Sequence, residues 1–236
     1  MSNYKPSIGK ILGATILAPD LEKVIQPYVT DLDYKIVNRG NVSEKLAKIW
    51  NASEHIDAET VILSPESSNP PWIRFVQAKP VNNYKAMTTF GWHSLEINVQ
   101  DVDKIPQKLK NSSFKIIGQP HNLGMSSSIR AMQVVGLAEE VLYLTQIPTD
   151  GTAPHLPNAE TFIDRIFIVP LGSPNMDRTR SWYMDQFSNI EKGMEARDIE
   201  MKLIANALNI DSKTKCSICT IRLPNKGSIE IDDYPS

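Results

Sequence analysis

The stretch "ILGATILAPDLEKVIQPYVTDLDYKIV", residues 11–37, sets out a pattern that returns later in the chain. Its apolar start alternates as a strand does, a turn with Pro and Asp follows, and apolar residues then recur at helical spacing. Residues 162–188, "FIDRIFIVPLGSPNMDRTRSWYMDQFS", follow the same order, and residues 91–117 repeat it with a shorter helix. Strand-like segments come after each helix, so the repeating element is predicted to be a βαβββ unit.

The repeats divide the chain into three modules. We define module 1 as residues 8–80, module 2 as residues 88–148 and module 3 as residues 162–236. Residues 149–161, which contain Pro, Gly and Asp, are predicted to be a linker. The predicted fold class is α+β, with half-open barrels of mixed, curved sheets and helices outside.

The pairing of the modules is a further expectation. Modules 1 and 2 are expected to pair in one domain, residues 1–148, which leaves module 3 as the first half of an incomplete second pair. An unpaired sheet would expose a large apolar surface. The chain is therefore expected either to be part of a four-module protein or to form a homodimer.

Composition limits the classes of partner. The 236 residues carry a formal net charge of −2 and are 41% hydrophobic. This near-neutral balance argues against nucleic acid or an anionic membrane as the main partner. The apolar run "ILGATILA" is too short to span a bilayer and lacks a cleavage region. The expectation is a soluble, cytoplasmic protein whose partner is a small molecule.

Two cysteines, Cys216 and Cys219, form a CxxC within "KCSICTIR". A second such pair is missing, and the context is an alternating strand rather than the start of a helix. Residues three apart on a strand point to opposite faces. The pattern therefore predicts two buried or half-buried thiols rather than a redox or zinc site.

These repeats, with "DL…PYVTDLDY" after the first strand, resemble the vicinal oxygen chelate superfamily, over essentially the whole chain. The segments "AMQVVG…EVLYLTQIP" and "FIDRIFIVPL" are similar to a bacterial branch labelled glyoxalase- or dioxygenase-like. The resemblance implies paired modules that enclose a divalent metal. One ligand would come from the first strand of each module and one from its last strand.

Position by position, the resemblance predicts that modules 1 and 2 hold no metal. The four positions that correspond to the family's ligands carry Gly13, Arg74, Ser94 and Tyr143. None is a good ligand for a divalent cation. His93 stands one residue from the ligand position, and strand alternation therefore predicts that it points away from the site, unless a bulge shifts the register.

Module 3 departs from the family in a different way. The alignment puts Arg165 in the position of the family histidine, whereas Glu230 keeps the position of the carboxylate. The two side chains are expected to form an ion pair that replaces the metal bridge.

The residues expected to point into the first barrel are polar. The predicted ligand-binding residues are Thr15, Arg74, Ser94 and Asn98, with Glu96 and Tyr143 as catalytic candidates. An arginine beside hydroxyl and amide groups suits a carboxylate or phosphate. Equally, Arg74 could simply pair with Glu96 across the barrel.

Three functional hypotheses follow. The first is binding of a small organic anion or aromatic acid, with metal-independent isomerase or lyase activity in which Glu96 is the general base and Tyr143 the proton donor. The second is a divalent-metal (Fe, Zn or Mn) extradiol dioxygenase or glyoxalase whose ligands lie in another register. The third is a non-catalytic protein that sequesters small molecules, as bleomycin-resistance proteins do. The segment "NLGMSSSIRA" is predicted to be a turn or lid over the cleft.

Overall fold

The computed structural model describes residues 5–67, 70–123 and 128–234. Module 1 comprises β1 (Gly13–Ala18), α1 (Leu21–Thr30), β2 (Lys35–Asn41), α2 (Glu44–Trp50), η1 (Ser53–His55), β3 (Glu59–Ser64) and β4 (Trp72–Gln77). Module 2 comprises β5 (Gly91–Trp92), β6 (Ser94–Val99), η2 (Val102–Lys104), α3 (Ile105–Lys108), β7 (Lys115–Asn122), β8 (Arg130–Val135) and β9 (Val141–Gln146). Module 3 comprises β10 (Ile163–Ser173), α4 (Met176–Gln186), β11 (Glu191–Lys192), β12 (Arg197–Glu200), α5 (Lys202–Leu208), β13 (Lys215–Leu223), η3 (Pro224–Lys226) and β14 (Gly227–Asp233). The predicted α+β class with βαβββ modules is confirmed.

The first helix of each module begins with the same contact, which we call the helix-start hydrogen bond: a backbone N–H at the start of the helix donates to a side chain at the end of the module's last strand. In module 1 the Leu21 N–H donates to the side chain of Gln77 at the end of β4, over 3.2 Å. The N–H of Val102 donates in the same way to Gln146 at the end of β9 (3.1 Å), and the N–H of Met176 donates to Asp233 at the end of β14 (3.1 Å). Because these N–H groups have no partner inside the helix, a side chain from the last strand satisfies them. The repeated contact makes the three modules equivalent position by position.

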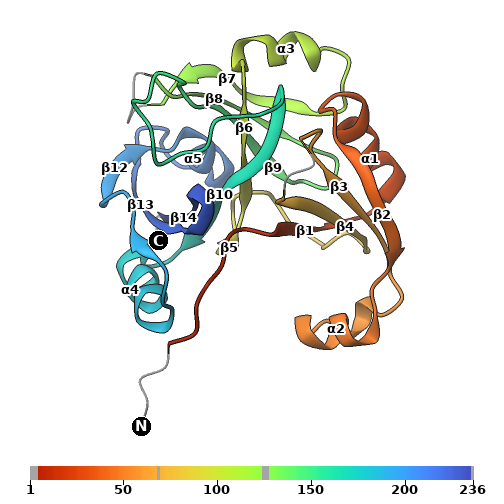
Figure 1. Ribbon diagram of the computed structural model, residues 1–236. Coiled ribbons are helices and arrows are strands. Elements are labelled where there is room, and N and C mark those ends of the chain that lie inside the picture. Colours follow the sequence, from red (N-terminus) through yellow and green to blue (C-terminus); the bar gives the residue numbers. More distant parts are fainter. Residues whose placement is uncertain (1–4, 68–69, 124–127, 235–236) are drawn as a thin grey trace.

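Over the described residues the strands form two sheets (Figure 1). Module 1 makes a four-stranded sheet in the order β1-β4-β3-β2. Modules 2 and 3 share a ten-stranded sheet, because β6 and β10 pair antiparallel. The expected pairing of modules 1 and 2 in one barrel was therefore wrong. Sequence periodicity identifies each first strand as an edge of its own module, but it does not say which two edges meet.

Modules 1 and 2 instead pack through their helical faces. Tyr28 on α1 meets Phe114 of module 2 with ring centroids 5.1 Å apart, and Lys108 pairs with Asp33 at 3.0 Å. The shared core also takes the outward faces of both sheets, including Phe75 and Ile97. Burial of this apolar surface is the main force that joins the two modules.

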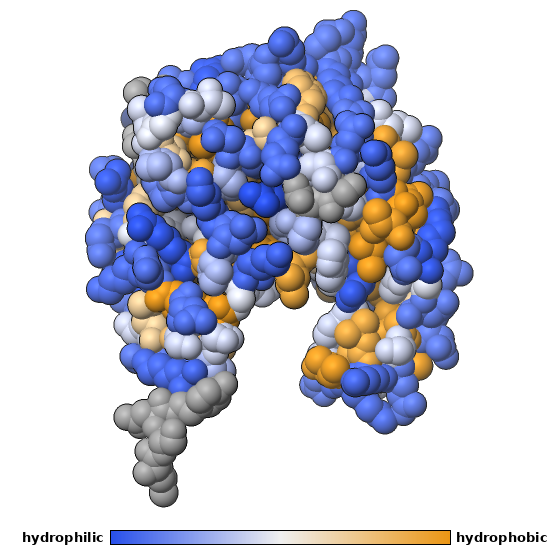
Figure 2. Space-filling model, viewed as in Figure 1, coloured by the Kyte–Doolittle hydropathy of each residue, from blue (hydrophilic) through white to orange (hydrophobic). Residues whose placement is uncertain are grey.

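The arrangement leaves a hollow on one side of the molecule. Figure 2 shows an arch, and Figure 1 identifies α4 on one arm, α2 on the other and β1 along the roof between them. Within the described ranges, no helix has both the length and the apolar character needed to cross a membrane.

Candidate functional site

A bulge in module 2 decides the direction of His93. The strand is interrupted at this residue, between β5 and β6. Trp92 pairs with Leu171 whereas Glu96 pairs with Ile168, a shift of one residue in register. Such a shift turns a side chain to the other face. The prediction that His93 points away from the site was therefore wrong.

His93 is buried in a chain of three polar side chains. Its Nε2 lies 2.8 Å from Oδ2 of Asp232 on β14, and its Nδ1 lies 3.1 Å from Oγ of Ser94. Asp232, when ionised, can only accept, so Nε2–H donates to it and the Ser94 hydroxyl can donate to Nδ1. The Oδ1 atom of Asp232 and the hydroxyl of Tyr234, both buried, have no hydrogen-bond partner among the described residues.

Glu96 lies near two further carboxylates inside the sheet of modules 2 and 3. The Thr145 hydroxyl donates to Glu96 over 2.6 Å. Burial and the nearby Asp232 carboxylate raise the pKa of Glu96 to about 7, although the hydrogen bond from Thr145 lowers it. Burial, Asp232 and Glu96 together raise the pKa of Glu230 well above its ordinary value. We call Glu96, Glu230 and Asp232 the acidic cluster.

Tyr143 is the neighbour of Glu96 in the parallel pair β6–β9. Burial and the acidic cluster raise the pKa of its hydroxyl well above the ordinary value, so the group keeps its proton. The helix α5 covers this face, because Ile204 packs in one apolar cluster with Val141, Tyr143 and Tyr234. The two catalytic candidates of the sequence are thus adjacent, in a covered interior.

Arg165 and Glu230 do not form the expected ion pair. The helix-start hydrogen bonds make Val102 and Met176 equivalent. Counting back from them makes Ile168, not Arg165, equivalent to Ser94. The residue that pairs with Glu230 is Pro170. The alignment from sequence was three residues out because β10 is longer than β1 and contains register shifts.

The side chain of Asn98 makes structural hydrogen bonds at both of its ends. Its side-chain amide donates to the carbonyl of Pro157, and its Oδ1 accepts from the N–H of Arg165 at 3.0 Å. Both ends of the amide are therefore used to tie the segment between modules 2 and 3 to β6. Its predicted role in ligand binding is not supported.

The concave face of module 1 holds Arg74. Its guanidinium carbon lies 4.7 Å from the centre of the Trp72 ring and 5.3 Å from that of Trp50. No carboxylate pairs with it among the residues that the structure describes. The alternative pairing of Arg74 with Glu96 is wrong, since Glu96 belongs to the other sheet.

A pocket of about 1210 Å³ opens between module 1 and the start of β6. Its lining includes Thr15 and Leu17 from β1, Trp50 from α2, and His93 and Ser94. The residues that were predicted to point into one barrel are therefore divided between two places. Thr15 and Ser94 share this pocket and Arg74 pairs with Thr15 in the sheet, whereas Glu96 and Tyr143 lie in the other barrel.

Gly13 makes room for the Trp72 ring. A Cβ at this position would lie 2.3 Å from the ring. We expect Gly13→Ala to displace the indole from Arg74 and to cost about 1–3 kcal/mol of unfolding free energy. Gly9→Ala is the matched control, since its Cβ would meet nothing within 4 Å. Urea unfolding and the near-ultraviolet circular dichroism of the tryptophans measure both effects; equal spectra and stabilities would contradict the packing described.

The residues at the family's ligand positions do not fit a metal. When the modules are aligned by their helix-start hydrogen bonds, these positions carry Gly13 and Arg74 in module 1, and Ser94, Tyr143, Ile168 and Glu230 in modules 2 and 3. Only Glu230 offers a good ligand atom. Over the described part of the chain, no group of three or more His, Cys, Asp or Glu side chains could hold an ion.

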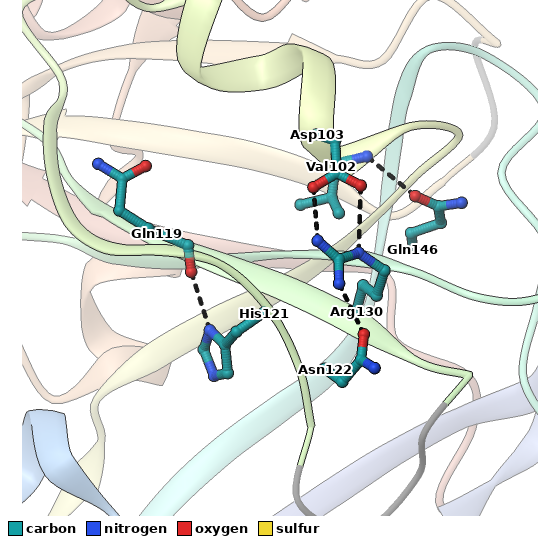
Figure 3. Close-up of polar contacts among 7 residues, drawn as sticks. All are labelled: Val102, Asp103, Gln119, His121, Asn122, Arg130 and Gln146. Atoms are coloured by element: carbon teal, nitrogen blue, oxygen red, sulfur yellow. Dashed lines mark hydrogen bonds and ion pairs between the residues drawn. The ribbon is translucent and has the colours of Figure 1, made fainter.

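Other motifs have structural roles. Cys216 and Cys219 are both buried, as predicted, and burial raises the pKa of the Cys219 thiol to about 11. Of the expected lid "NLGMSSSIRA", residues 124–127 lie outside the described residues. At its end Arg130 binds Asp103 through two hydrogen bonds, of 2.6 and 3.1 Å, and Asn122 through a third (Figure 3). This network fastens the β7–β8 hairpin to the helical turn of module 2.

Sequence reasoning missed several residues of these sites. Asp232 stands two residues after Glu230 in "SIEIDD", so strand alternation could have placed it on the same face. Trp50 lies on α2, between the second and third strands of module 1, and no sequence signal predicted its contact with Arg74.

The comparisons with known proteins show the fold. A mutant form of glyoxalase I from Zea mays matches with a TM-score of 0.65 and 14% identity, over 94% of this chain and 68% of that one. A Bacillus subtilis protein provisionally assigned as a dioxygenase matches with a TM-score of 0.63 and 12% identity, over 98% and 66%. The chain thus spans about two-thirds of the length of each. No family model and no curated protein matches the sequence. The chain therefore has the same fold as these two proteins, as the resemblance predicted.

Proposed function

We propose that this protein binds a small organic anion with an aromatic body on the concave face of module 1. The observation that carries the proposal is Arg74, which stacks on Trp50 and Trp72 and has no carboxylate partner among the described residues. The aromatic contacts use no N–H group of the guanidinium, so these donors can bind a carboxylate.

The neighbouring pocket suits the rest of such a ligand. Trp50 belongs both to the stack on Arg74 and to the lining of the 1210 Å³ pocket. Thr15, the residue beside Arg74, adds a hydroxyl at the same place. Pockets of this kind bind through apolar walls and a few polar groups that fix orientation.

Benzoate is the probe that tests this function. We expect it to bind the protein by isothermal titration calorimetry, and we expect Arg74→Ala to weaken binding roughly tenfold to hundredfold, since hydrogen bonds to a charged group are lost. Arg39→Ala is the control, because the guanidinium of Arg39 is already held by Glu22 on the same module. Benzyl alcohol, which lacks the charge, should bind weakly. Equal affinity of the wild-type and Arg74→Ala proteins would refute the proposal.

Proton-transfer chemistry at Glu96 is a second candidate. A carboxyl with a pKa of about 7 can act as a base near neutral pH, and the protonated Tyr143 beside it can act as an acid. Because the acidic cluster repels anions, the substrate there would be a neutral carbon acid, separate from the anion at Arg74. Glu96→Gln should abolish such turnover and leave benzoate binding at Arg74 unchanged. If the chain turns nothing over, sequestration of the anion is the function that remains.

A further inference from the structure

The ring of His93 joins a hydroxyl to a carboxylate. Its Nε2 lies 2.8 Å from the carboxylate of Asp232, and its Nδ1 lies 3.1 Å from the hydroxyl of Ser94. An ionised carboxylate only accepts hydrogen bonds, so it holds the ring proton on Nε2 and leaves the lone pair of Nδ1 directed at the serine. A nucleophile within hydrogen-bonding distance of a base, with the base oriented by a third group, is the arrangement that activates serine in hydrolases. The two ring nitrogens here exchange the roles that they have in the common triad, in which Nε2 faces the serine.

This chain of side chains lies at a pocket that suits an apolar substrate. His93 and Ser94 both line the 1210 Å³ pocket, where β5 and β1 lie close together in Figure 1. Apolar walls of this kind bind the apolar part of a ligand. The large apolar residues that line the pocket and are 42% to 64% exposed are Leu17, Val81, Tyr84, Trp92 and Leu137.

We propose that the protein is also a serine esterase. Ser94 is the nucleophile, His93 is the general base, and Asp232 positions His93. The substrates are uncharged carboxylic esters with an apolar or aromatic acyl group, because the walls of the pocket are apolar and the acidic cluster repels anions. This activity is separate from the anion at Arg74 and from proton transfer at Glu96.

The reaction has two steps. In the first, Nδ1 of His93 takes the hydroxyl proton while Oγ of Ser94 bonds to the carbonyl carbon of the ester. The bond from that carbon to the alcohol oxygen then breaks, and the alcohol leaves with the proton from Nδ1. In the second, water attacks the acyl-serine in the same way, the bond from Oγ to carbon breaks, and Oγ recovers a proton. The sum is ester and water to acid and alcohol, and Asp232 offsets the charge of the imidazolium in both steps.

The hydroxyl of Tyr234 provides a donor for the negative charge that develops on the carbonyl oxygen. It is buried and has no hydrogen-bond partner in the described part of the chain. Its ring lies beside the ring of His93, with centroids 5.6 Å apart. Burial and the carboxylate of Asp232 raise its pKa above the ordinary value, so the hydroxyl keeps its proton. A donor placed in this way stabilises the tetrahedral intermediate.

Labelling with a fluorophosphonate tests the nucleophile. The reagent forms a covalent bond with activated serines, and peptide mass spectrometry locates it. We expect one phosphonyl group per full-length chain, on Ser94, and no label in Ser94→Ala. Ser228→Ala is the matched control and should be labelled like the wild type, because Ser228 is equally buried, at 7% exposed, and no histidine within the described ranges bonds to its hydroxyl. No label, or a label only on other residues, would overturn the proposal.

Hydrolysis of p-nitrophenyl butyrate measures the activity itself. Ser94→Ala should abolish the protein-dependent release of p-nitrophenolate, and Ser228→Ala should not change it. Tyr234→Phe should lower kcat roughly hundredfold without loss of stability in urea, because the hydroxyl has no hydrogen bond to lose. Wild-type rates in Ser94→Ala would overturn the proposal, and a wild-type rate in Tyr234→Phe would overturn the role of that residue.

Nitrogen NMR of the His93 ring tests the positioning role of Asp232. The expected spectrum of the wild type has the proton on Nε2. Asp232→Asn should reduce that population and lower kcat by roughly hundredfold to ten-thousandfold. A wild-type ring with the proton on Nδ1 would overturn the proposal, because that nitrogen could not then accept the proton of Ser94. Benzoate binding is measured separately, so failure here is distinguishable from failure at Arg74.

Discussion

His93→Ala is expected to destabilise the protein by about 3–5 kcal/mol. The substitution leaves the Asp232 carboxylate buried without its partner at 2.8 Å, beside Glu96 and Glu230. Removing the donor of a buried hydrogen bond to a carboxylate costs this much when the group left behind has neither water nor another partner. Urea unfolding followed by circular dichroism at pH 7 measures the change.

His121→Ala and a double variant supply the controls. The ring of His121 is exposed and contacts only the Gln119 carbonyl, at 2.8 Å, among the interactions described (Figure 3), so its loss should cost less than about 0.5 kcal/mol. Asp232→Asn replaces the carboxylate that accepts the hydrogen bond from His93 by an amide. The double variant His93→Ala with Asp232→Asn should therefore be less destabilised than the sum of the two single variants. Additive losses would show that the pair does not act as a unit.

The stability of the wild-type protein is expected to fall as the pH rises from about 5 to 8. The pKa of Glu96 is about 7 in the folded protein and 4.5 when unperturbed, so the folded state holds this proton more tightly. Its stabilising contribution is complete below pH 4.5 and is lost as the pH passes through 7. The shift corresponds to about 3 kcal/mol. Glu140, whose pKa burial raises to about 6, adds to the fall in the same direction.

The variant Glu96→Gln isolates the part of the pH-dependent loss of stability that is due to Glu96. The amide keeps an oxygen that can accept from Thr145 and does not titrate, so the fall between pH 5 and 8 should shrink by about 3 kcal/mol. Glu191→Gln, on the exposed strand β11, is the control and should reproduce the wild-type curve. A Glu96→Gln curve with the wild-type slope would show that Glu96 is ionised in the fold at neutral pH without penalty.

The repeating fold could be predicted from the sequence because several independent signals indicate the same order of elements. Strand alternation, the acidic turn at Asp20 and Asp101 and the helical spacing after it recur in order, and the N-cap role of Asp20 is observed directly. The pairing of modules was not predictable in this way. All three first strands have similar apolar patterns, and only the surfaces between modules decide that β6 meets β10.

The candidate site was only partly predictable. Strand alternation predicted that Glu96 and Tyr143 point into the same barrel, and the two residues are neighbours on paired strands. His93 was assigned to the wrong face because one bulged residue reverses the phase, and a bulge leaves no signal in a single sequence. Arg165 was misaligned because β10 is longer than the other first strands. The contact of Trp50 with Arg74 joins segments without any shared periodicity.

A crystal structure with bound benzoate tests the central claim most directly. The claim is that the guanidinium of Arg74, in contact with two indole rings and lacking a carboxylate partner among the described residues, is the anion-binding group of this protein. The account predicts density for the carboxylate within hydrogen-bonding distance of Arg74 and for the ring in the pocket beside Trp50. Benzoate bound next to Glu96 instead, or an Arg74 side chain turned away to pair with a carboxylate of the protein, would contradict it.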